Sequence, residues 1–374
     1  MARSFSVACG PDSLVQHLTE ARRAVPSASG GIVFLSGALT QRVDTVAELL
    51  RSAWRGVPAC VVPAAGVLNE RGEIEGESAA AGVLWAGGRT APFALGEGGG
   101  GEALERAAAQ RAATAILFAQ PDAFGPTMLD ELAARAPRAC VFGAGTVGGG
   151  AVGVTEEGKL LTGPAVGLTI TGLAPPLVEA SPACRLLSTF QPIEEVSGGL
   201  VLRVGGRPAL DLLSSSSADL VKRPGAAPLI FAALAEEPLE PEGGATPRFV
   251  IRAIRGVDPT RRGVMIGDDV RPGVRLAFAV RDAAAALAGV EEMARRISRN
   301  ALGSAPRFAL YLSCAGRGQG LHGAPSVEAR LLRQRFADLP IAGMHSAFEI
   351  APWAPGEGRL AFYTGVLALF RAPS

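Results

Sequence analysis

Residues 31–66, GIVFLSGALTQRVDTVAELLRSAWRGVPACVVPAAG, decide the fold of this chain. The stretch opens with an apolar run, continues with apolar residues three to four positions apart, and closes with a second apolar run. That spacing gives a helix one buried face, formed by Val46, Leu49 and Leu50. Pro58 then ends the helix before the second run. The stretch therefore predicts a strand, a loop, an amphipathic helix and a second strand.

The same order of elements recurs twice. Residues 114–149 repeat it and end in PRACVFGAG, similar to the PACVVPAAG that closes the first copy. Residues 308–350, FALYLSCAGRGQGLHGAPSVEARLLRQRFADLPIAGMHSAFEI, form a third copy. Short apolar runs that end in glycine separate the copies and indicate hairpins. The sequence thus predicts an α/β fold of the mixed α+β kind: two related halves whose mixed sheets carry helices on their outer faces.

The domain boundary is expected where the composition changes. Residues 182–197 lead from the first two copies into a region of new hairpins. A chain of 374 residues is long for one core and sufficient for two. We therefore predict one domain over residues 1–190 and a second over residues 191–374.

Composition excludes several classes of protein. With 48% hydrophobic and 19% charged residues, the chain is too apolar for disorder. A net charge of +1 lacks the basic excess of a nucleic-acid binder. We expect no secretory signal, since residues 1–11 lack a basic end followed by an apolar run, and no membrane insertion, since no apolar run reaches roughly 18 residues. Five scattered cysteines without a CxxC pair suit a reducing compartment. The prediction is a soluble cytoplasmic protein.

A glycine motif after the second copy has two interpretations. Gly143, Gly145 and Gly148 stand in GxGxxG spacing directly after an expected strand. A dinucleotide site needs a helix immediately afterwards, and the β-like AVGVTEEGKLLTG follows instead. Tight backbone turns at a sheet edge explain these glycines better.

The third copy differs from the other two in its chemistry. Its loop contains Cys314, Arg317 and His322, and its returning strand leads to His345 and Glu349. Cys314 with either histidine suggests a cysteine nucleophile and its base, whereas a cysteine that ends a buried strand is usually a core residue. One neutral histidine also suffices for an axial haem ligand. Three histidines in the whole chain leave little for a multi-histidine metal site.

One further pair of charged residues lies outside the copies. Arg281 and Asp282 stand where an expected strand meets an expected helix. Arg281 is a candidate for holding an anionic ligand. Asp282 is better explained as the N-cap that accepts backbone N–H bonds of the helix.

Several motifs, in order along the chain, carry a family resemblance. The chain resembles a FIST protein, with an N-terminal FIST domain followed by a FIST C-terminal domain, from about Gly31 almost to its end. The stretches that resemble the family are AAGVLNERGEIEGESAAAGVLWA (64–86), ILFAQPDAF (116–124), GAGTVGGG (143–150), PACRLLSTFQPIEEVSGGLVLRVGGRPALDLL (182–213), FVIRAIRGVDPTRRGVMIGDDVRPGVRLAFAVRDAAAA (249–286), and SCAGRG, GAPSVEA and LPIAGMHSAFEIAP in the third copy.

The resemblance implies a small-ligand sensory module of bacterial signal transduction, related to haem-binding FIST proteins that sense nitric oxide. We therefore expect a non-enzymatic sensor that binds a small ligand between its FIST N and C halves and signals to a separate partner, such as a histidine kinase. No catalytic residue is expected. The predicted ligand-binding residues are Cys314, Arg317, Gly318, His322, His345, Glu349 and Arg281, with Arg317 facing an anionic group and Glu349 orienting Arg317 or accepting from a ligand amine.

This chain departs from the family pattern at the expected pocket. Met344 and His345 replace aromatic residues, Phe348 replaces a glycine, and Ala361 stands where the family often has a histidine. Two alternatives follow. The first is a protein-interaction scaffold whose pocket is occluded by Phe348. The second is a haem-binding nitric-oxide sensor, in which His345, or His322 in its place, would be the metal ligand; otherwise no cofactor is expected.

Overall fold

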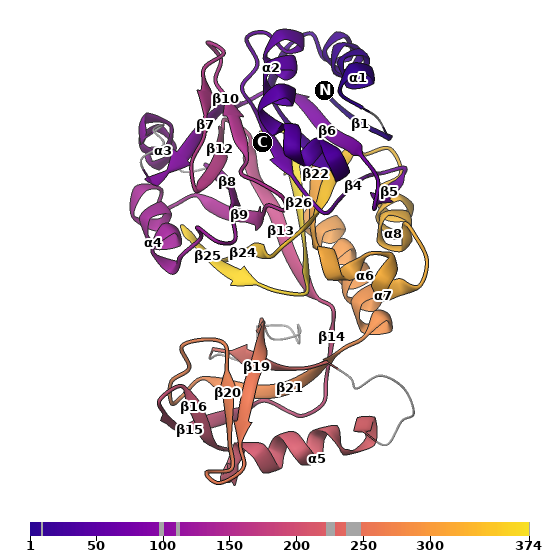
Figure 1. The fold of residues 1–374 in the computed structure, drawn as a ribbon. Helices are drawn as coiled ribbons and strands as arrows, with labels where there is room; N and C mark the ends of the chain where they lie inside the picture. The colour runs from indigo at the N-terminus through magenta and orange to yellow at the C-terminus, as the bar shows by residue number, and fades with distance from the viewer. Residues whose placement is uncertain (9, 97–100, 110–112, 222–228, 237–247, 374) are drawn as a thin grey trace. The chain divides into compact units, whose positions relative to one another are not determined.

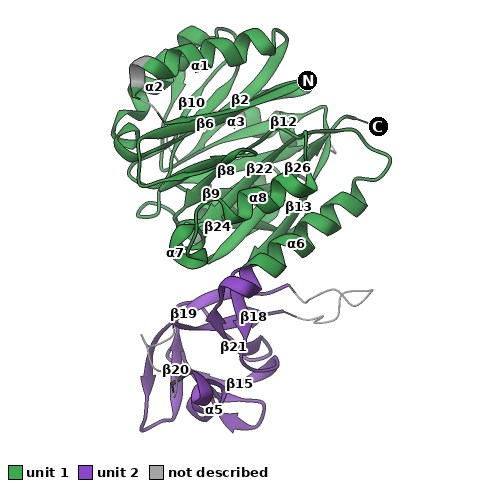
Figure 2. Cartoon of the chain, turned by 90° about the vertical axis from the view of Figure 1, so that its right-hand side faces the viewer, with its two compact units in different colours: residues 1–181, 287–374 green, residues 182–286 purple. Residues whose placement is uncertain are grey.

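The computed structural model describes residues 1–8, 10–96, 101–109, 113–221, 229–236 and 248–373 (Figure 1). The chain divides into two compact units (Figure 2). Unit 1 consists of residues 1–181 and 287–374, and unit 2 consists of residues 182–286. Both predicted domains contribute residues to both units, because the chain leaves unit 1 and later returns to it. The assignment of domains to residues 1–190 and 191–374 stays a prediction, since these units follow spatial contacts and not family boundaries.

Each of the three sequence copies forms a strand–helix–strand unit in unit 1. The copies are β2 (Ala28–Ser36), η1 (Gly37–Arg42), α2 (Val43–Ala53) and β3 (Ala59–Pro63); β8 (Thr114–Ala119), α4 (Pro126–Arg135) and β9 (Cys140–Gly145); and β22 (Pro306–Cys314), η3 (Ala315–Arg317), α7 (Gln319–His322), α8 (Val327–Arg335) and β23 (Ile341–Ser346). Within each copy the two strands pair in parallel, as a helical crossover requires.

Each copy belongs to a different six-stranded sheet, with strand orders β1-β6-β2-β3-β10-β11, β25-β24-β9-β8-β12-β7 and β13-β26-β22-β23-β4-β5. The added strands are β1 (Ala2–Ala8), β6 (Ala79–Ala86), β10 (Val152–Val154) and β11 (Leu160–Leu161); β7 (Arg89–Leu95), β12 (Ala165–Thr171), β24 (Glu349–Ala354) and β25 (Glu357–Ala361); and β4 (Gly66–Asn69), β5 (Gly72–Glu75), β13 (Ala174–Pro182) and β26 (Thr364–Arg371). The hairpin β4–β5 thus joins the sheet of the third copy, and β24–β25 joins the sheet of the second.

The sheets share an inner core, and helices cover their other faces. Along β2, Ile32 and Phe34 contribute to the inner cluster, whereas Val33 and Leu35 pack under helices, because neighbouring side chains of a strand point to opposite faces. Phe308 stacks on Phe370 in the inner core, with ring centroids 4.4 Å apart. The helices that cover the outer faces, besides α2, α4 and α8, are α1 (Pro11–Ala24), α3 (Gly101–Ala108) and α6 (Ala283–Asn300). The predicted mixed fold with helices on outer faces is confirmed.

Unit 2 is an antiparallel sheet that closes on itself. Its elements are β14 (Cys184–Leu186), β15 (Gln191–Ser197), β16 (Leu200–Val204), β17 (Arg207–Pro208), α5 (Ala209–Val221), β18 (Ile230–Ala235), β19 (Val250–Asp258), β20 (Gly263–Ile266) and β21 (Arg275–Arg281). Strand β21 pairs with β15 on one side and β18 on the other, and the pairing continues through β16, β20 and β19. Closure of this kind leaves few exposed strand edges.

Two local predictions are settled by the backbone. After β9, residues 146–151 lead into strand β10 and not into a helix, and Gly148 has φ +86°, so the GxGxxG glycines form a turn. At the start of α6, Asp282 accepts the backbone N–H of Ala285 at 2.8 Å. The N-cap interpretation of Asp282 is therefore confirmed. Among the described helices, none is long and apolar enough to cross a membrane.

Candidate ligand-binding site

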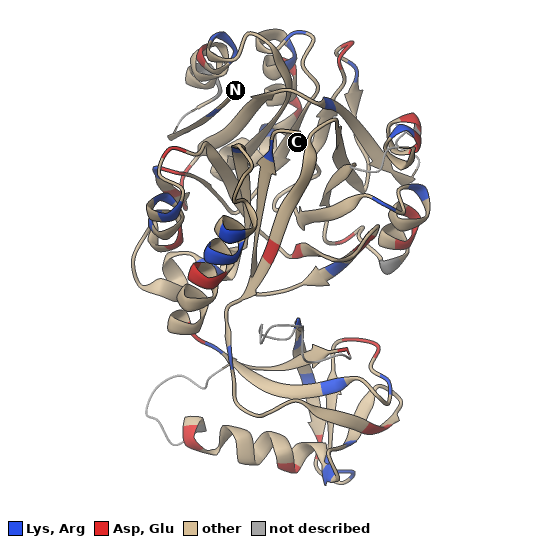
Figure 3. Cartoon of the chain, turned by 180° about the vertical axis from the view of Figure 1, so that it is seen from behind, with Lys and Arg blue, Asp and Glu red and all other residues tan. Residues whose placement is uncertain are grey.

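Most charged residues lie on helices and loops, and the strands of unit 1 carry few (Figure 3). The third copy contains a buried ion pair between η3, just beyond the end of β22, and α8. Arg317 is 0% exposed and Glu328 is 2% exposed. Nη2 of Arg317 lies 2.8 Å from Oε1 of Glu328, and its Nη1 donates to the Ser181 carbonyl at 2.7 Å. Charge-assisted hydrogen bonds of this kind are the strong ones, and here they hold the η3 turn onto α8.

Glu328 has further hydrogen-bond partners on β22 and on α7. Tyr311 and Ser313, two residues apart on β22, present their side chains to the same face of the sheet. Tyr311 donates to Oε2 of Glu328 at 2.7 Å, and Nε2 of His322 lies 3.0 Å from Oε1. Burial favours the protonated acid, but the Arg317 guanidinium and these hydrogen bonds hold the pKa of Glu328 at about 2. Glu328 is therefore a buried carboxylate.

Glu349, the first residue of β24, is a second buried acid, and its pKa is raised where that of Glu328 is lowered. Ser346 donates its hydroxyl to Oε1 at 2.7 Å, and the backbone N–H of Thr364 donates to Oε2 at 3.2 Å. Burial nevertheless raises the pKa of Glu349 to about 8, against the lowering by these two donors and by Arg317. Glu349 is therefore mostly protonated at neutral pH, next to a region in which Glu328 is charged.

Glu349→Gln is expected to flatten the pH dependence of stability. In the wild type the folded state keeps a proton, with a pKa of about 8, that the unfolded state loses near 4.5. The free energy of unfolding must then fall as pH rises from about 4.5 to about 8. Glutamine is neutral throughout, so the variant should lose this fall in urea unfolding between pH 5 and 9. Glu131→Gln, at a half-exposed position on α4, serves as control, and equal slopes in the two variants would contradict the assignment.

Cys314 ends β22 beside these acids and is buried. Burial, and the Glu349 carboxyl after it, raise the pKa of the thiol to about 11. The thiol is therefore protonated at neutral pH, and a protonated thiol is a weak nucleophile. This environment is typical of a structural cysteine.

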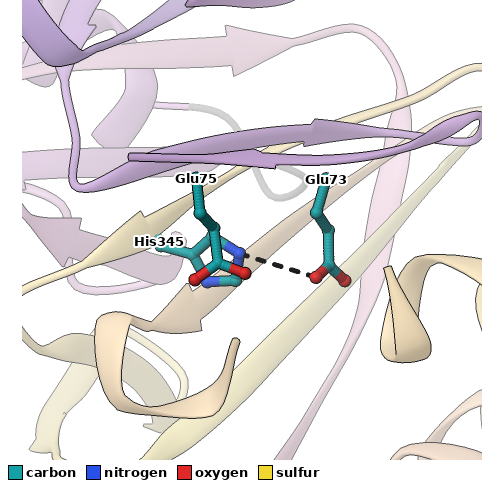
Figure 4. A group of neighbouring side chains, drawn as sticks. All are labelled: Glu73, Glu75 and His345. Carbon is teal, nitrogen blue, oxygen red and sulfur yellow. Dashed lines mark ion pairs between the residues drawn. The ribbon is translucent and has the colours of Figure 1, made fainter. Parts of the chain in front are cut away.

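A second polar group lies on the neighbouring strands of the same sheet (Figure 4). In the strand pairing His345 stands opposite Gly66 of β4, and Gly66 stands opposite Glu75 of β5. Glu73, two residues before Glu75, points to the same face. Nε2 of His345 lies 3.9 Å from Oε2 of Glu73. Burial raises the pKa of Glu73, and the nearby His345 opposes that shift.

The β4–β5 hairpin is fastened to the loop of the third copy by three hydrogen bonds. Oε1 of Glu75 accepts the backbone N–H of Gln319 at 2.9 Å, and Oε1 of Glu73 accepts that of Ala329 at 3.0 Å. In return, the backbone N–H of Glu73 donates to Oγ of Ser326 at 2.9 Å. Glu73 thus caps the N-terminus of α8 from a distant segment, which a carboxylate does well at the positive end of a helix.

The structure brings together most of the predicted ligand-binding residues. Arg317 and His322 meet at Glu328, and Glu349 and Cys314 interact electrostatically with Arg317. A Cβ on Gly318 would clash with the carboxylate of Glu75, so a larger residue there would push that carboxylate aside. Arg281, in contrast, ends β21 in unit 2. It is not among the residues that unit 1 brings together.

Three acids of the site were not predicted as site residues. Glu328, not Glu349, pairs with Arg317, although both acids were visible in the third copy. Glu328 lies at the start of a helix, where an acid is usually solvated, and nothing in the sequence therefore indicates that it is buried. Glu73 and Glu75 lay in the stretch 64–86 that resembles the family, and the alternation GEIEGE was the available signal.

The surroundings of the two histidines do not fit a haem. The Nε2 of His345 faces the carboxylate of Glu73, and a porphyrin bound to that nitrogen would press its apolar face against Glu73 and Glu75. The Nε2 of His322 is already engaged with Glu328. The donors around His345 suit a small cation instead, and haem has no part in the function proposed below.

Comparison with known proteins identifies the family. Residues 209–352 match the model of the FIST C domain. Uncharacterized protein Rv0628c of Mycobacterium tuberculosis (strain ATCC 25618 / H37Rv) is 28% identical over 390 residues, which cover 99% of this chain and 100% of that protein. Uncharacterized protein Mb0898c of Mycobacterium bovis (strain ATCC BAA-935 / AF2122/97) is 30% identical over 271 residues, covering 68% of this chain and 67% of that protein.

This chain therefore belongs to one family with these mycobacterial proteins, and it carries a FIST C domain. A FIST domain implies a sensory or signal-transduction role. The predicted resemblance is thus confirmed for the C-terminal domain. The N-terminal FIST domain and the relation to haem-binding nitric-oxide sensors stay predictions.

Proposed function

We propose that this protein is a non-enzymatic cytoplasmic sensor that binds a small polar ligand where its predicted FIST N and C halves meet in unit 1, and signals to a separate partner protein such as a histidine kinase. One observation carries the proposal. Titratable residues from both predicted halves lie close together, with the partly buried Glu73 and Glu75 from the first half and the buried Arg317, Glu328 and Glu349 from the second.

The energetic cost of this cluster supports a functional role. Burying charges is expensive, and a buried ion pair is often no more stable than well-packed apolar residues of similar volume. Such a cluster is therefore poor evidence for stability and better evidence for recognition. Gln319 and Gly320, in the loop that leads away from the buried Arg317, are exposed to solvent. A short movement of α7 would open the cluster to a ligand.

The contacts of the cluster give a ligand a means of changing the protein. An anionic group on the ligand competes with Glu328 for Arg317, and an amine finds an acceptor in Glu349. Displacement of Glu328 loosens α8, whose N-terminus Glu73 caps at Ala329. The ligand thereby changes how the β4–β5 hairpin is bonded to the third copy. This connection then has two states, and the partner protein binds one of them better than the other.

A thermal-shift screen of amino acids and small organic anions on the full chain tests this function. A true ligand at one hundred times its dissociation constant stabilises the folded state by about 2.7 kcal/mol. We expect Glu349→Gln to weaken that shift, and Glu131→Gln, a half-exposed residue of α4 outside the cluster, to leave it intact. The proposal fails if no compound in the screen stabilises the wild type, or if Glu349→Gln and Glu131→Gln respond identically.

A specific observation also supports the scaffold alternative. All three guanidinium nitrogens of Arg317 are engaged by protein groups, so the cluster is closed to an anion without rearrangement. Phe348 packs against Phe124 in an apolar cluster, with ring centroids 4.9 Å apart. A partner that co-purifies with the chain, together with a screen that finds no ligand, would favour the scaffold over the sensor.

A further inference from the structure

The imidazole of His345 lacks the partners that a buried polar ring needs. His345 is 2% exposed, and neither of its ring nitrogens has a hydrogen-bond partner among the residues that the structure describes. Buried polar groups in native proteins are nearly always paired with protein, water or an ion. A buried imidazole that makes no hydrogen bond, and only a 3.9 Å contact with Glu73, therefore points to a partner that the described residues do not supply.

Two carboxylates lie beside this ring, in an arrangement suited to holding a metal ion. One ligand atom each of Glu73, Glu75 and His345 lies within 4.8 Å of the others (Figure 4). Both glutamates use Oε1 for a backbone N–H, from Ala329 and Gln319 respectively. These bonds orient the carboxylates and direct Oε2 of Glu73 at the imidazole, at 3.9 Å from Nε2. Outer hydrogen bonds of this type hold metal ligands in place in metalloproteins.

Sheet register explains how the side chains of His345 and Glu75 can approach each other. Gly66 stands between His345 and Glu75 in the strand pairing. A Cβ at Gly66 would lie 2.9 Å from Cδ2 of His345 and 3.2 Å from Cγ of Glu75. Any larger residue would fill the middle of the group. Glycine at this position lets the imidazole and the carboxylates lie side by side on one face of the sheet.

The charge around the group favours a divalent cation. Glu73 and Glu75 have a third acid nearby, since Glu328 also acts on Glu73 electrostatically, and Arg317 is the cation that pairs with Glu328. Three acids against one guanidinium leave an excess of acidic groups next to the imidazole of His345. A divalent ion at Glu73, Glu75 and His345 would neutralise that excess and give the ring nitrogen its missing partner.

We propose that Glu73, Glu75 and His345 form a binding site for a divalent transition-metal ion of the Zn²⁺ or Co²⁺ type. One imidazole nitrogen and two carboxylate oxygens are donors that these ions accept. Ligand atoms about 2.0–2.2 Å from a tetrahedral ion lie roughly 3.4 Å apart, so the 3.9 Å between His345 and Glu73 needs only a small contraction. The fourth position is open to water or to a small molecule. This inference goes beyond the proposed sensor function and does not depend on it.

Titration of the chelator-treated full chain with ZnCl₂ and with CoCl₂ tests the site. We expect one ion per chain by calorimetry, and visible absorption typical of Co²⁺ in low coordination. Glu75→Gln and Glu73→Gln keep an amide oxygen for the backbone N–H bonds but lose a charged ligand, and each should weaken binding at least tenfold. The matched control is Glu77→Gln, whose side chain is exposed and outside the group.

A second measurement needs no variant and therefore remains decisive if a variant does not fold. The chain has three histidines, so their ring signals can be resolved by NMR. Bound Co²⁺ should shift and broaden the His345 ring signals and leave those of His17 unchanged. The proposal is overturned if no ion binds, if His345 is unaffected by Co²⁺, or if Glu75→Gln and Glu73→Gln bind as tightly as Glu77→Gln. Because the probe is the metal alone, none of these results bears on the binding of a small polar ligand.

Discussion

Arg317→Ala is expected to lower the free energy of unfolding by about 3–5 kcal/mol, as measured by urea denaturation. The substitution removes the guanidinium that compensates Glu328, a carboxylate only 2% exposed. It also leaves the Ser181 carbonyl without its Nη1 donor. Tyr311 and His322 cannot replace a full positive charge, so the remaining carboxylate must take up a proton or draw in water.

The control for this prediction is an ion pair of the same residue types in solvent. Arg135 and Glu131 form an i,i+4 pair on α4 with an N–O distance of 3.2 Å, and both are exposed. Arg135→Ala should cost at most about 1 kcal/mol. The double variant Arg317→Met/Glu328→Leu should recover much of the loss, because it leaves no unpaired charge. A cost of Arg317→Ala as small as that of Arg135→Ala would contradict the buried-pair interpretation.

Local patterns were enough to predict the repeated units but not their partners. The spacing of apolar residues identified each strand–helix–strand copy, because burial of one helix face is a local property. Hairpin β4–β5 pairs with β23, as His345 with Gly66 shows, across more than 270 residues of chain. Nothing in the local sequence specifies that pairing. It depends on how three sheets share one inner core, which is a property of the whole unit.

The candidate site was also predictable only in part: the residues of the third copy could be identified, but their partners could not. Comparison among the copies singled out Arg317 and His345, because only the third copy has such side chains at these positions. The acids that complete the site have two origins. Glu328 lies in the third copy, on α8, and contacts Tyr311 of β22, whereas Glu73 reaches the site through the β4–β5 hairpin. Long-range register supplies Glu73, and a single sequence does not reveal register between distant strands.

Gly343→Ala and Gly143→Ala are expected to lower the free energy of unfolding by about 1–3 kcal/mol or more each. The two glycines occupy matching places in the third and second copies. Gly343 pairs with Tyr311, and Gly143 pairs with Leu117, in the parallel strand pairs. A Cβ at either position would lie 1.9 Å from the carbonyl oxygen of its partner. Because that atom belongs to the backbone of a buried strand, the sheet itself must shift.

Gly343→Ala should have a second effect that Gly143→Ala lacks. Displacing the Tyr311 backbone disturbs the 2.7 Å bond between the Tyr311 hydroxyl and Glu328, so the loss from Gly343→Ala and the loss from Tyr311→Phe should not add. Urea unfolding of both single variants and the double variant measures this coupling. The control is Gly149→Ala, where the nearest atom is 3.7 Å from the new Cβ. Additive losses, or a Gly343→Ala variant as stable as Gly149→Ala, would show that the third copy does not tie its strand pairing to the buried acid.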